Sequence, residues 1–194
     1  MGFASLNRFG SHCGRTRMFG KAQPRAVVAG LVLSGAALVG IAVKEDYRGV
    51  AYQDSVGVWT NGYGETKGVK PGDTTTPARA LVQLLSSAEA HAAGIRACFA
   101  GASLYQHEFD AYASLAYNVG VGAVCGSSIP AKVKAGQYDA ACRTILDFDN
   151  VRDCSKPKVL NPKTGRMECP LVKLRGLTIR RQAEFRQCTG EATA

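Results

Sequence analysis

The strongest constraint on this chain is a run of 18 residues, 26–43, that contains no charged side chain. Such a length is the lower limit for a helix that crosses a bilayer. Half of the run is Gly, Ala or Ser, residues that gain little free energy on transfer into lipid. The stretch before it, residues 1–25, has no acidic residue and five cations: Arg8, Arg15, Arg17, Lys21 and Arg25. A basic flank of this kind stays in the cytoplasm, so the pattern predicts a weak N-terminal membrane-anchor helix with the rest of the chain exported.

Three fates of this apolar segment are open. It could be cleaved as part of a signal peptide, because Gly40-Ile41-Ala42 offers small residues at a suitable spacing. It could be a permanent anchor, or an uncleaved anchor that is weak enough to leave the bilayer later. Cleavage after Ala42 would leave Glu45 third from a frayed terminus, which argues against cleavage if Glu45 is catalytic.

Residues 44–194 have the size of one ordinary domain, and a chain that is 46% hydrophobic can bury a core. The net charge of the chain is +9, and removing the five N-terminal cations leaves +4 for the rest. A basic domain is attracted to an anionic polymer such as nucleic acid, a membrane surface or the bacterial wall. No predicted helix carries a dense row of Lys or Arg with interleaved aromatics, so nucleic acid is not expected as a partner. We expect a monomer.

Six of the seven cysteines follow the apolar run, and Cys13 precedes it. The chain has no Cys-x-x-Cys pair and only three His, so we expect no metal site. Cysteines behind a membrane-targeting segment reach an oxidising compartment, where disulfides form. The candidates are Cys98, Cys125, Cys142, Cys154, Cys169 and Cys188. Cys154–Cys169 is the favoured pair because it flanks a turn-rich loop, and the other pairings stay open.

The predicted elements alternate between a small β region and several helices. Residues 45–66 are rich in Gly, Tyr and Thr and predict a short helix followed by a β-hairpin. Apolar residues at helical spacing predict four longer helices, at 76–98, 106–119, 137–148 and 174–188. A short helix is expected after Ser128, and a loop at 151–170. The fold class is therefore α+β, with a small β-hairpin lobe, a larger helical lobe and a cleft between them that suits a polymer.

Glu45, Asp54 and Thr60 are the candidate catalytic residues. Glycoside hydrolysis needs one carboxyl group that protonates the leaving oxygen and a second that supports the developing cation or activates water. Glu45, in a cleft at a helix end, could keep a raised pKa and act as the acid. Asp54 would stay ionised and face the sugar, and the Thr60 hydroxyl could hold the attacking water. A Glu and an Asp nine residues apart occur in many proteins, so this spacing alone does not establish catalysis.

The sequence around these residues resembles the active-site stretch of phage-type lysozymes, glycoside hydrolase family 24. Two segments, Glu45 to Asp54 and Gly57 to Gly64, are similar to Glu-Gly-x-Arg-x-x-x-Tyr-x-Asp and Gly-x-x-Thr-x-Gly-Tyr-Gly of that family. Residues 106–120 are similar to its second motif, and Gly176-Leu177-x-x-Arg180-Arg181-x-x-Glu184 to its C-terminal one. Two features depart from the pattern: Asp46 replaces the usual Gly, and an insert lies around 151–170.

The resemblance implies a lysozyme-like two-lobed fold and hydrolysis of the β-1,4 bond between N-acetylmuramic acid and N-acetylglucosamine in peptidoglycan, with inversion and without a cofactor. By the same motif, Glu45 would be the acid, Asp54 the carboxylate that positions water and Thr60 the water ligand. Asn118 could bind substrate or cap a helix end, and Tyr63 could stack on a sugar or belong to the core. Arg181 could approach Glu45 and hold the site together, or it could be a surface cation.

The apolar segment also resembles the Gly/Ala-rich signal-arrest-release segment of some phage endolysins. The resemblance implies three regions: a basic cytoplasmic stretch at 1–25, a weak transmembrane segment at 26–43 and a catalytic domain at 44–194. The protein would first be tethered in the host inner membrane and inactive, then released into the periplasm, where it causes lysis. Two rivals stay open. One is a lytic transglycosylase, against which the Asp54–Thr60 pair argues. The other is an inert wall-binding or membrane-anchored structural protein with the same fold, against which the intact Glu45, Asp54 and Thr60 set argues.

Overall fold

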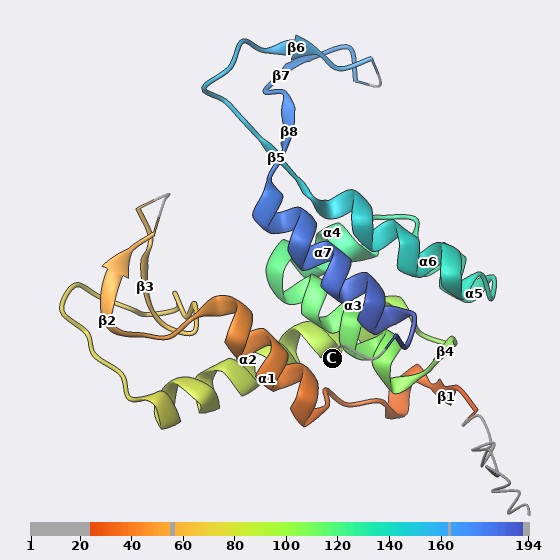
Figure 1. Ribbon diagram of the computed structural model, residues 1–194, viewed down its shortest axis with the longest axis horizontal. Coiled ribbons are helices and arrows are strands. Elements are labelled where there is room, and N and C mark those ends of the chain that lie inside the picture. Colours follow the sequence, from red (N-terminus) through yellow and green to blue (C-terminus); the bar gives the residue numbers. More distant parts are fainter. Residues whose placement is uncertain (1–23, 55–56, 163, 192–194) are drawn as a thin grey trace, which may run out of the picture.

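The computed structural model describes residues 24–54, 57–162 and 164–191 (Figure 1). One helical group surrounds α3 (Gln106–Val119), and a separate small hairpin pairs β2 (Arg48–Gln53) with β3 (Trp59–Gly62). The remaining helices are α1 (Gly35–Glu45), α2 (Pro77–Cys98), α4 (Val121–Cys125), α5 (Ile129–Lys134), α6 (Tyr138–Thr144), the 3-10 helix η2 (Ile145–Phe148) and α7 (Arg175–Cys188). The predicted α+β class with two lobes is confirmed.

Helix α3 is the centre of the helical lobe, and nine successive residues, Glu108 to Ala116, are buried. Phe109, Tyr112 and Leu115 have no exposed surface, and each fully buried large apolar side chain contributes roughly 1.5–3 kcal/mol to folding. Helices α7 and α2 pack on α3 along much of its length. A helix buried on all sides is held by its neighbours, so α3 provides a rigid base for the elements around it.

Residues 26–43 do not form the single anchor helix that the sequence predicted. β1 (Ala26–Val27) pairs with β4 (Ser103–Leu104), a 3-10 turn, η1, follows at Val28–Gly30, and α1 begins only at Gly35. Ser34 starts α1 because its hydroxyl oxygen accepts a hydrogen bond from the Ala37 amide at 3.1 Å. Within the described part of the chain, no helix combines the length and the apolar character needed to span a bilayer.

The apolar segment is part of the folded domain instead. Its side chains alternate between the core and the surface, so that Val28 and Ile41 are buried whereas Val39 and Val43 are 61% and 78% exposed. Helix α1 packs against both α2 and α3. The folded domain therefore includes residues 26–43 together with the residues that follow.

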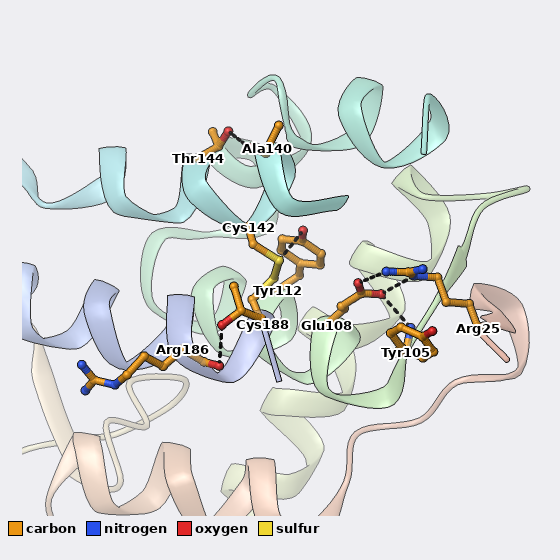
Figure 2. The surroundings of a disulfide bond; sticks show 10 residues. Arg25, Tyr105, Glu108, Tyr112, Ala140, Cys142, Thr144, Arg186 and Cys188 are labelled. Carbon is orange, nitrogen blue, oxygen red and sulfur yellow. Dashed lines mark hydrogen bonds and ion pairs between the residues drawn. A yellow bond between two sulfur atoms is a disulfide. The ribbon is translucent and has the colours of Figure 1, made fainter. Parts of the chain in front are cut away.

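Three disulfides join the six predicted cysteines: Cys98–Cys125, Cys142–Cys188 and Cys154–Cys169. The last confirms the favoured pair. Cys98–Cys125 ties the end of α2 to α4, and Cys142–Cys188 ties α6 to the end of α7, close to the Tyr112 ring (Figure 2). Cys13 lies outside the described residues.

The insert at 151–170 is more ordered than the expected loop. β5 (Asn150–Arg152) pairs with β8 (Leu171–Lys173), and β6 (Val159–Leu160) pairs with β7 (Met167–Glu168). These paired strands form an arm that projects from the start of α7 (Figure 1). Cys154–Cys169 closes the arm between its two ladders. The sequence suggested a loop because strands of two or three residues are too short to show an alternating pattern.

Candidate active site

Glu45 is the last residue of α1, and the chain reverses immediately after it into the β2–β3 hairpin. The reversal places Asp46 at φ 59° and ψ 159°, a backbone conformation that essentially only Gly adopts without strain. The phage-type lysozymes that this sequence resembles have Gly at this position. The backbone conformation gives a physical reason for that preference. In this chain Asp46 adopts this conformation despite its side chain, and its Oδ1 accepts a hydrogen bond from the Tyr47 amide at 2.8 Å.

The Glu45 carboxylate lies between the two lobes. Its Oε1 accepts a hydrogen bond from Arg180 Nη2 of α7 at 2.8 Å. A Cβ added at Gly64, just after β3, would be 3.7 Å from its Oε2. Both side chains of the ion pair are mostly buried, with Arg180 13% and Glu45 20% exposed. One oxygen is therefore fixed by the helical lobe while the other faces the hairpin lobe.

Arg180 is itself held by a buried carboxylate, Glu184, one turn further along α7. Arg180 Nε lies 3.4 Å from Glu184 Oε1, and Ser114 of α3 donates its hydroxyl to the same oxygen at 3.0 Å. Lys44 Nζ, adjacent to the candidate acid in sequence, approaches that oxygen at 3.4 Å. Burial lowers the pKa of Lys44, opposed by the negative charge of Glu184. The network joins α1, α3 and α7 directly behind Glu45.

The structure corrects the prediction for Arg181. Its side chain has no exposed surface, so it can neither touch a substrate nor act as a surface cation, and the residue that pairs with Glu45 is Arg180. Successive residues of a helix point about 100° apart, so only one of the two neighbouring arginines can face the acid. Arg181 faces the interior, where Nε lies 3.0 Å from Glu184 Oε2 and Nη2 donates to Asn118 Oδ1 at 2.7 Å. The sequence does not distinguish the two arginines, because Glu184 lies four residues after Arg180 and three after Arg181, and both spacings bring side chains together on a helix.

Asp54 and Thr60 lie on the hairpin lobe, around the tip of the β2–β3 ladder. Asp54 follows β2, and its Oδ1 accepts a hydrogen bond from the Val58 amide at 2.9 Å. Thr60 pairs with Tyr52 across the ladder, and its hydroxyl donates to the Val58 carbonyl at 3.1 Å. Thr60 is only 4% exposed, so its side chain is fixed in place. The roles of Asp54 and Thr60 at the water nucleophile stay predictions.

The two other predicted substrate-binding residues, Asn118 and Tyr63, differ in their exposure. Asn118 is exposed in the last turn of α3, and Arg181 fixes its amide oxygen. Tyr63 packs partly against the core, with its ring centroid 5.5 Å from that of Tyr47. Its carbonyl accepts a hydrogen bond from the Tyr117 hydroxyl at 3.1 Å, which ties the hairpin lobe to α3. Burial, aided by the negative charges of Glu45 and Glu65, raises the pKa of Tyr117 to about 12, so Tyr117 keeps its donor proton at neutral pH.

A cavity of about 710 Å³ lies beside this centre, along the first turns of α7. It is lined by Lys44, Leu174, Arg175, Gly176, Leu177, Ile179, Arg180 and Ala183. Two of these residues belong to the Glu45 surroundings, and Leu174 and Arg175 follow the arm directly. The cavity therefore connects the carboxylate centre with the base of the arm.

Residues 42–184 match the family Phage lysozyme. An endolysin of Acyrthosiphon pisum secondary endosymbiont phage 1 is 32% identical over 148 residues, which cover 75% of this chain and 91% of the relative. A SAR-endolysin of Escherichia phage P1 is 27% identical, over 89% of this chain and 86% of the relative. The structure is similar to that of the active form of P1 phage endolysin Lyz, with a TM-score of 0.66, 25% identity and coverage of 89% of this chain and 99% of that one.

The family match and the endolysin relatives indicate a lysozyme-like glycoside hydrolase, and the Glu45 carboxylate between the two lobes is consistent with one. The family match spans well over half of the chain, and the chain belongs to the phage lysozyme family. The sequence-based assignment to this family is confirmed.

The strained backbone at Asp46 predicts that Asp46→Gly stabilises the protein. Relief of about 1–3 kcal/mol of strain should exceed the roughly 1 kcal/mol that Gly loses in backbone entropy. We expect the free energy of unfolding in urea to rise by about 1 kcal/mol. The control is Asp46→Ala, which keeps a Cβ and removes the bond to the Tyr47 amide, and it should be less stable than wild type. If Asp46→Gly were less stable than wild type, the proposed backbone strain at Asp46 would be contradicted.

The two neighbouring arginines should separate activity from stability. Arg180→Met removes the partner of Glu45, and we expect turnover to fall about ten- to a hundredfold through misplacement of the acid. Arg181→Met leaves Glu184 without one of its buried partners and should lower the free energy of unfolding by about 3 kcal/mol. Turbidity assays and urea unfolding of both variants measure these effects. A stable but inactive Arg181→Met, beside an active Arg180→Met, would reverse the assignment.

Proposed function

We propose that the protein is an endolysin that hydrolyses the β-1,4 bond between N-acetylmuramic acid and N-acetylglucosamine in peptidoglycan and thereby lyses the host cell. The observation that carries this proposal is the Glu45 carboxylate, whose Oε1 is fixed by Arg180 of the helical lobe and whose Oε2 lies next to Gly64 of the hairpin lobe. The relatives named endolysin and the family match support the same activity.

Glu45 gives its proton to the glycosidic oxygen as the bond to the sugar carbon breaks. A water molecule attacks that carbon from the opposite face, and Asp54 takes a proton from it. Thr60 would hold this water through its hydroxyl, whose position is already fixed by burial and by its bond to Val58. Attack from the opposite face inverts the configuration at the carbon. A lytic transglycosylase needs no such water, and its anhydro product would be lighter by one water.

Hydrolysis is tested by turbidity clearing of purified peptidoglycan with wild type and Glu45→Gln. The Gln side chain has nearly the same shape but carries no acidic proton, so clearing should fall by a factor of about 10² or more. Mass spectrometry of the wild-type products should show reducing ends that contain the added water. Equal clearing by both proteins, no clearing by either, or anhydro products would each contradict the proposed hydrolysis.

We also propose that residues 26–43 first lie in the host inner membrane, with residues 1–25 in the cytoplasm, and later leave it for the periplasm. Support comes from the uncharged run with its basic flank and from the relative named SAR-endolysin. The segment cannot be a spanning helix and also supply β1, η1 and α1. A tethered chain would therefore hold Glu45 at the membrane surface, away from Arg180, and would be inactive.

More hydrophobic substitutions in this segment should prevent release. A Cβ at Gly30, Gly35 or Gly40 would meet no other atom within 4 Å, so we expect the folded domain to accept Leu at each position while the change strengthens the bilayer helix. We expect the triple Leu variant to stay in the membrane fraction and to lyse cells late or not at all. The matched control is Ser at the same three positions, which should stay releasable. Lysis of the Leu variant with wild-type timing would contradict the release mechanism, and a mature protein that begins near residue 43 would indicate cleavage instead.

A further inference from the structure

Arg25, the last cation before the apolar segment, has a specific binding site on the helical lobe. Its guanidinium makes two hydrogen bonds to the Glu108 carboxylate, Nε to Oε2 at 3.0 Å and Nη2 to Oε1 at 2.7 Å. Figure 2 shows the two side chains in contact, although Glu108 lies 83 positions after Arg25 in the sequence. A paired, parallel contact of this kind is specific to a guanidinium and is stronger than a hydrogen bond between neutral groups.

Two aromatic rings complete the site around Arg25. The guanidinium carbon lies 4.1 Å from the ring centroid of Tyr105 and 3.5 Å from that of Tyr138. Tyr105 precedes α3 and Tyr138 begins α6, so two helices contribute the walls while Glu108 lies in the first turn of α3. A planar cation between two rings gains attraction from both, and a Lys ammonium would lose the two-point contact with the carboxylate.

The site is built for a cation. Glu108 is 3% exposed, and its Oε2 also accepts a hydrogen bond from the Tyr105 amide at 2.7 Å. With Arg25 bound, the guanidinium offsets the desolvation of the Glu108 carboxylate. The pairing therefore stabilises the docked position of Arg25.

Binding of Arg25 places the next residues on the same surface. β1 pairs with β4, the Val28 amide donates to the Ala102 carbonyl at 3.0 Å, and the Val28 side chain is fully buried. Further bonds reach the backbone of the following loop: Arg96 to the Leu31 carbonyl, Gln106 to the Val32 carbonyl, and the Leu33 and Ser34 amides to Glu89 and Asp110. The segment is therefore docked from Arg25 up to the start of α1, which carries Glu45.

We propose that Tyr105, Glu108 and Tyr138 form a receptor site for Arg25 that retains the released N-terminal segment on the catalytic domain and opposes its return to the membrane. The retention role rests on the proposed release mechanism. In a tethered chain Arg25 lies on the cytoplasmic side and the receptor site on the exported side, so they meet only after Arg25 has crossed the bilayer. Once bound, the segment must break the ion pair and return a cation through lipid before it can reinsert.

Trypsin measures occupation of the site directly, because it cleaves after Arg or Lys only where the backbone is accessible. In the purified full-length protein we expect cleavage of the Arg25–Ala26 bond to be slower by about two orders of magnitude than in a peptide of residues 20–30. Glu108→Gln, Tyr138→Ala and Arg25→Lys should each accelerate it on the order of tenfold, and the last still offers trypsin a cation at this position. The matched control Tyr138→Phe keeps the ring and should behave as wild type. Cleavage of wild type at the peptide's rate, or equal protection in all variants, would overturn the site.

Thermal unfolding separates loss of the site from loss of the fold. Glu108→Gln and Tyr138→Ala should retain a cooperative transition, since the core formed by α2, α3 and α7 does not depend on Arg25. The pair Arg25→Glu with Glu108→Arg provides a second check that does not rely on any single variant folding well. The readout is the melting temperature, because Arg25→Glu removes the trypsin site. The pair should lose less than the sum of the two single variants, and additive loss would overturn the pairing.

Cell fractionation tests the retention role. After collapse of the membrane potential, Arg25→Lys should leave a several-fold larger share of protein in the membrane fraction than wild type, although its charge is unchanged. Lys21→Arg, a change of cation type in the same basic stretch, is the control and should match wild type. If Arg25→Lys were cleaved faster by trypsin but distributed between membrane and soluble fractions as wild type does, the retention role would be overturned. A wild type that never fractionates with membranes would instead refute the tether in the proposed function, while the trypsin result still decides the site.

Discussion

The buried carboxylate of Glu184 is the interaction on which the catalytic arrangement depends. It has no exposed surface, and it is surrounded by Ser114 and by the cations of Lys44, Arg180 and Arg181. A buried charge is tolerable only when partners offset its desolvation, so these side chains must all be in place together. Because the partners come from α1, α3 and α7, the network fixes the relative positions of three helices. Arg180, which this network holds in place, in turn fixes the Glu45 carboxylate through their ion pair.

The sequence predicted the helical lobe well because apolar residues recur at helical spacing and capping residues mark helix starts. Thr76 and Pro77 marked the start of α2, and the residues Gln106–Val119 form α3 as expected. The site was only partly predictable. Motif spacing identifies Glu45, but the choice between Arg180 and Arg181 depends on the rotation of α7 about its axis, which tertiary packing sets. The pairings Cys98–Cys125 and Cys142–Cys188 likewise depend on which helix ends meet in space.

The structure of residues 26–43 could not be predicted for a different reason. A uniformly apolar segment has no periodicity that separates a buried face from an exposed one, so its sequence is compatible with lipid and with a protein core alike. The abundance of small residues serves both environments. In the proposed tethered state it would make the bilayer helix weak, and in the folded domain it lets α1 pack on α2 and α3, with Ala37 and Ala42 of α1 buried. The cost is a row of exposed valines, Val27, Val32, Val39 and Val43, that a segment evolved only for water would not need.

The two cations that flank residues 26–43 help to hold this segment on the folded domain. Arg25 binds Glu108 at one end, and Lys44 approaches Glu184 at the other, so each boundary of the apolar run is fixed by a buried carboxylate. In a tethered chain the same two cations would mark the two faces of the bilayer, where charged residues are most favourable at the ends of a helix. Under the proposed release mechanism, one pattern of charges would thus serve two different structures. The apolar residues between them determine only that the segment avoids water, and the carboxylates at the two ends determine which surface of the domain it covers.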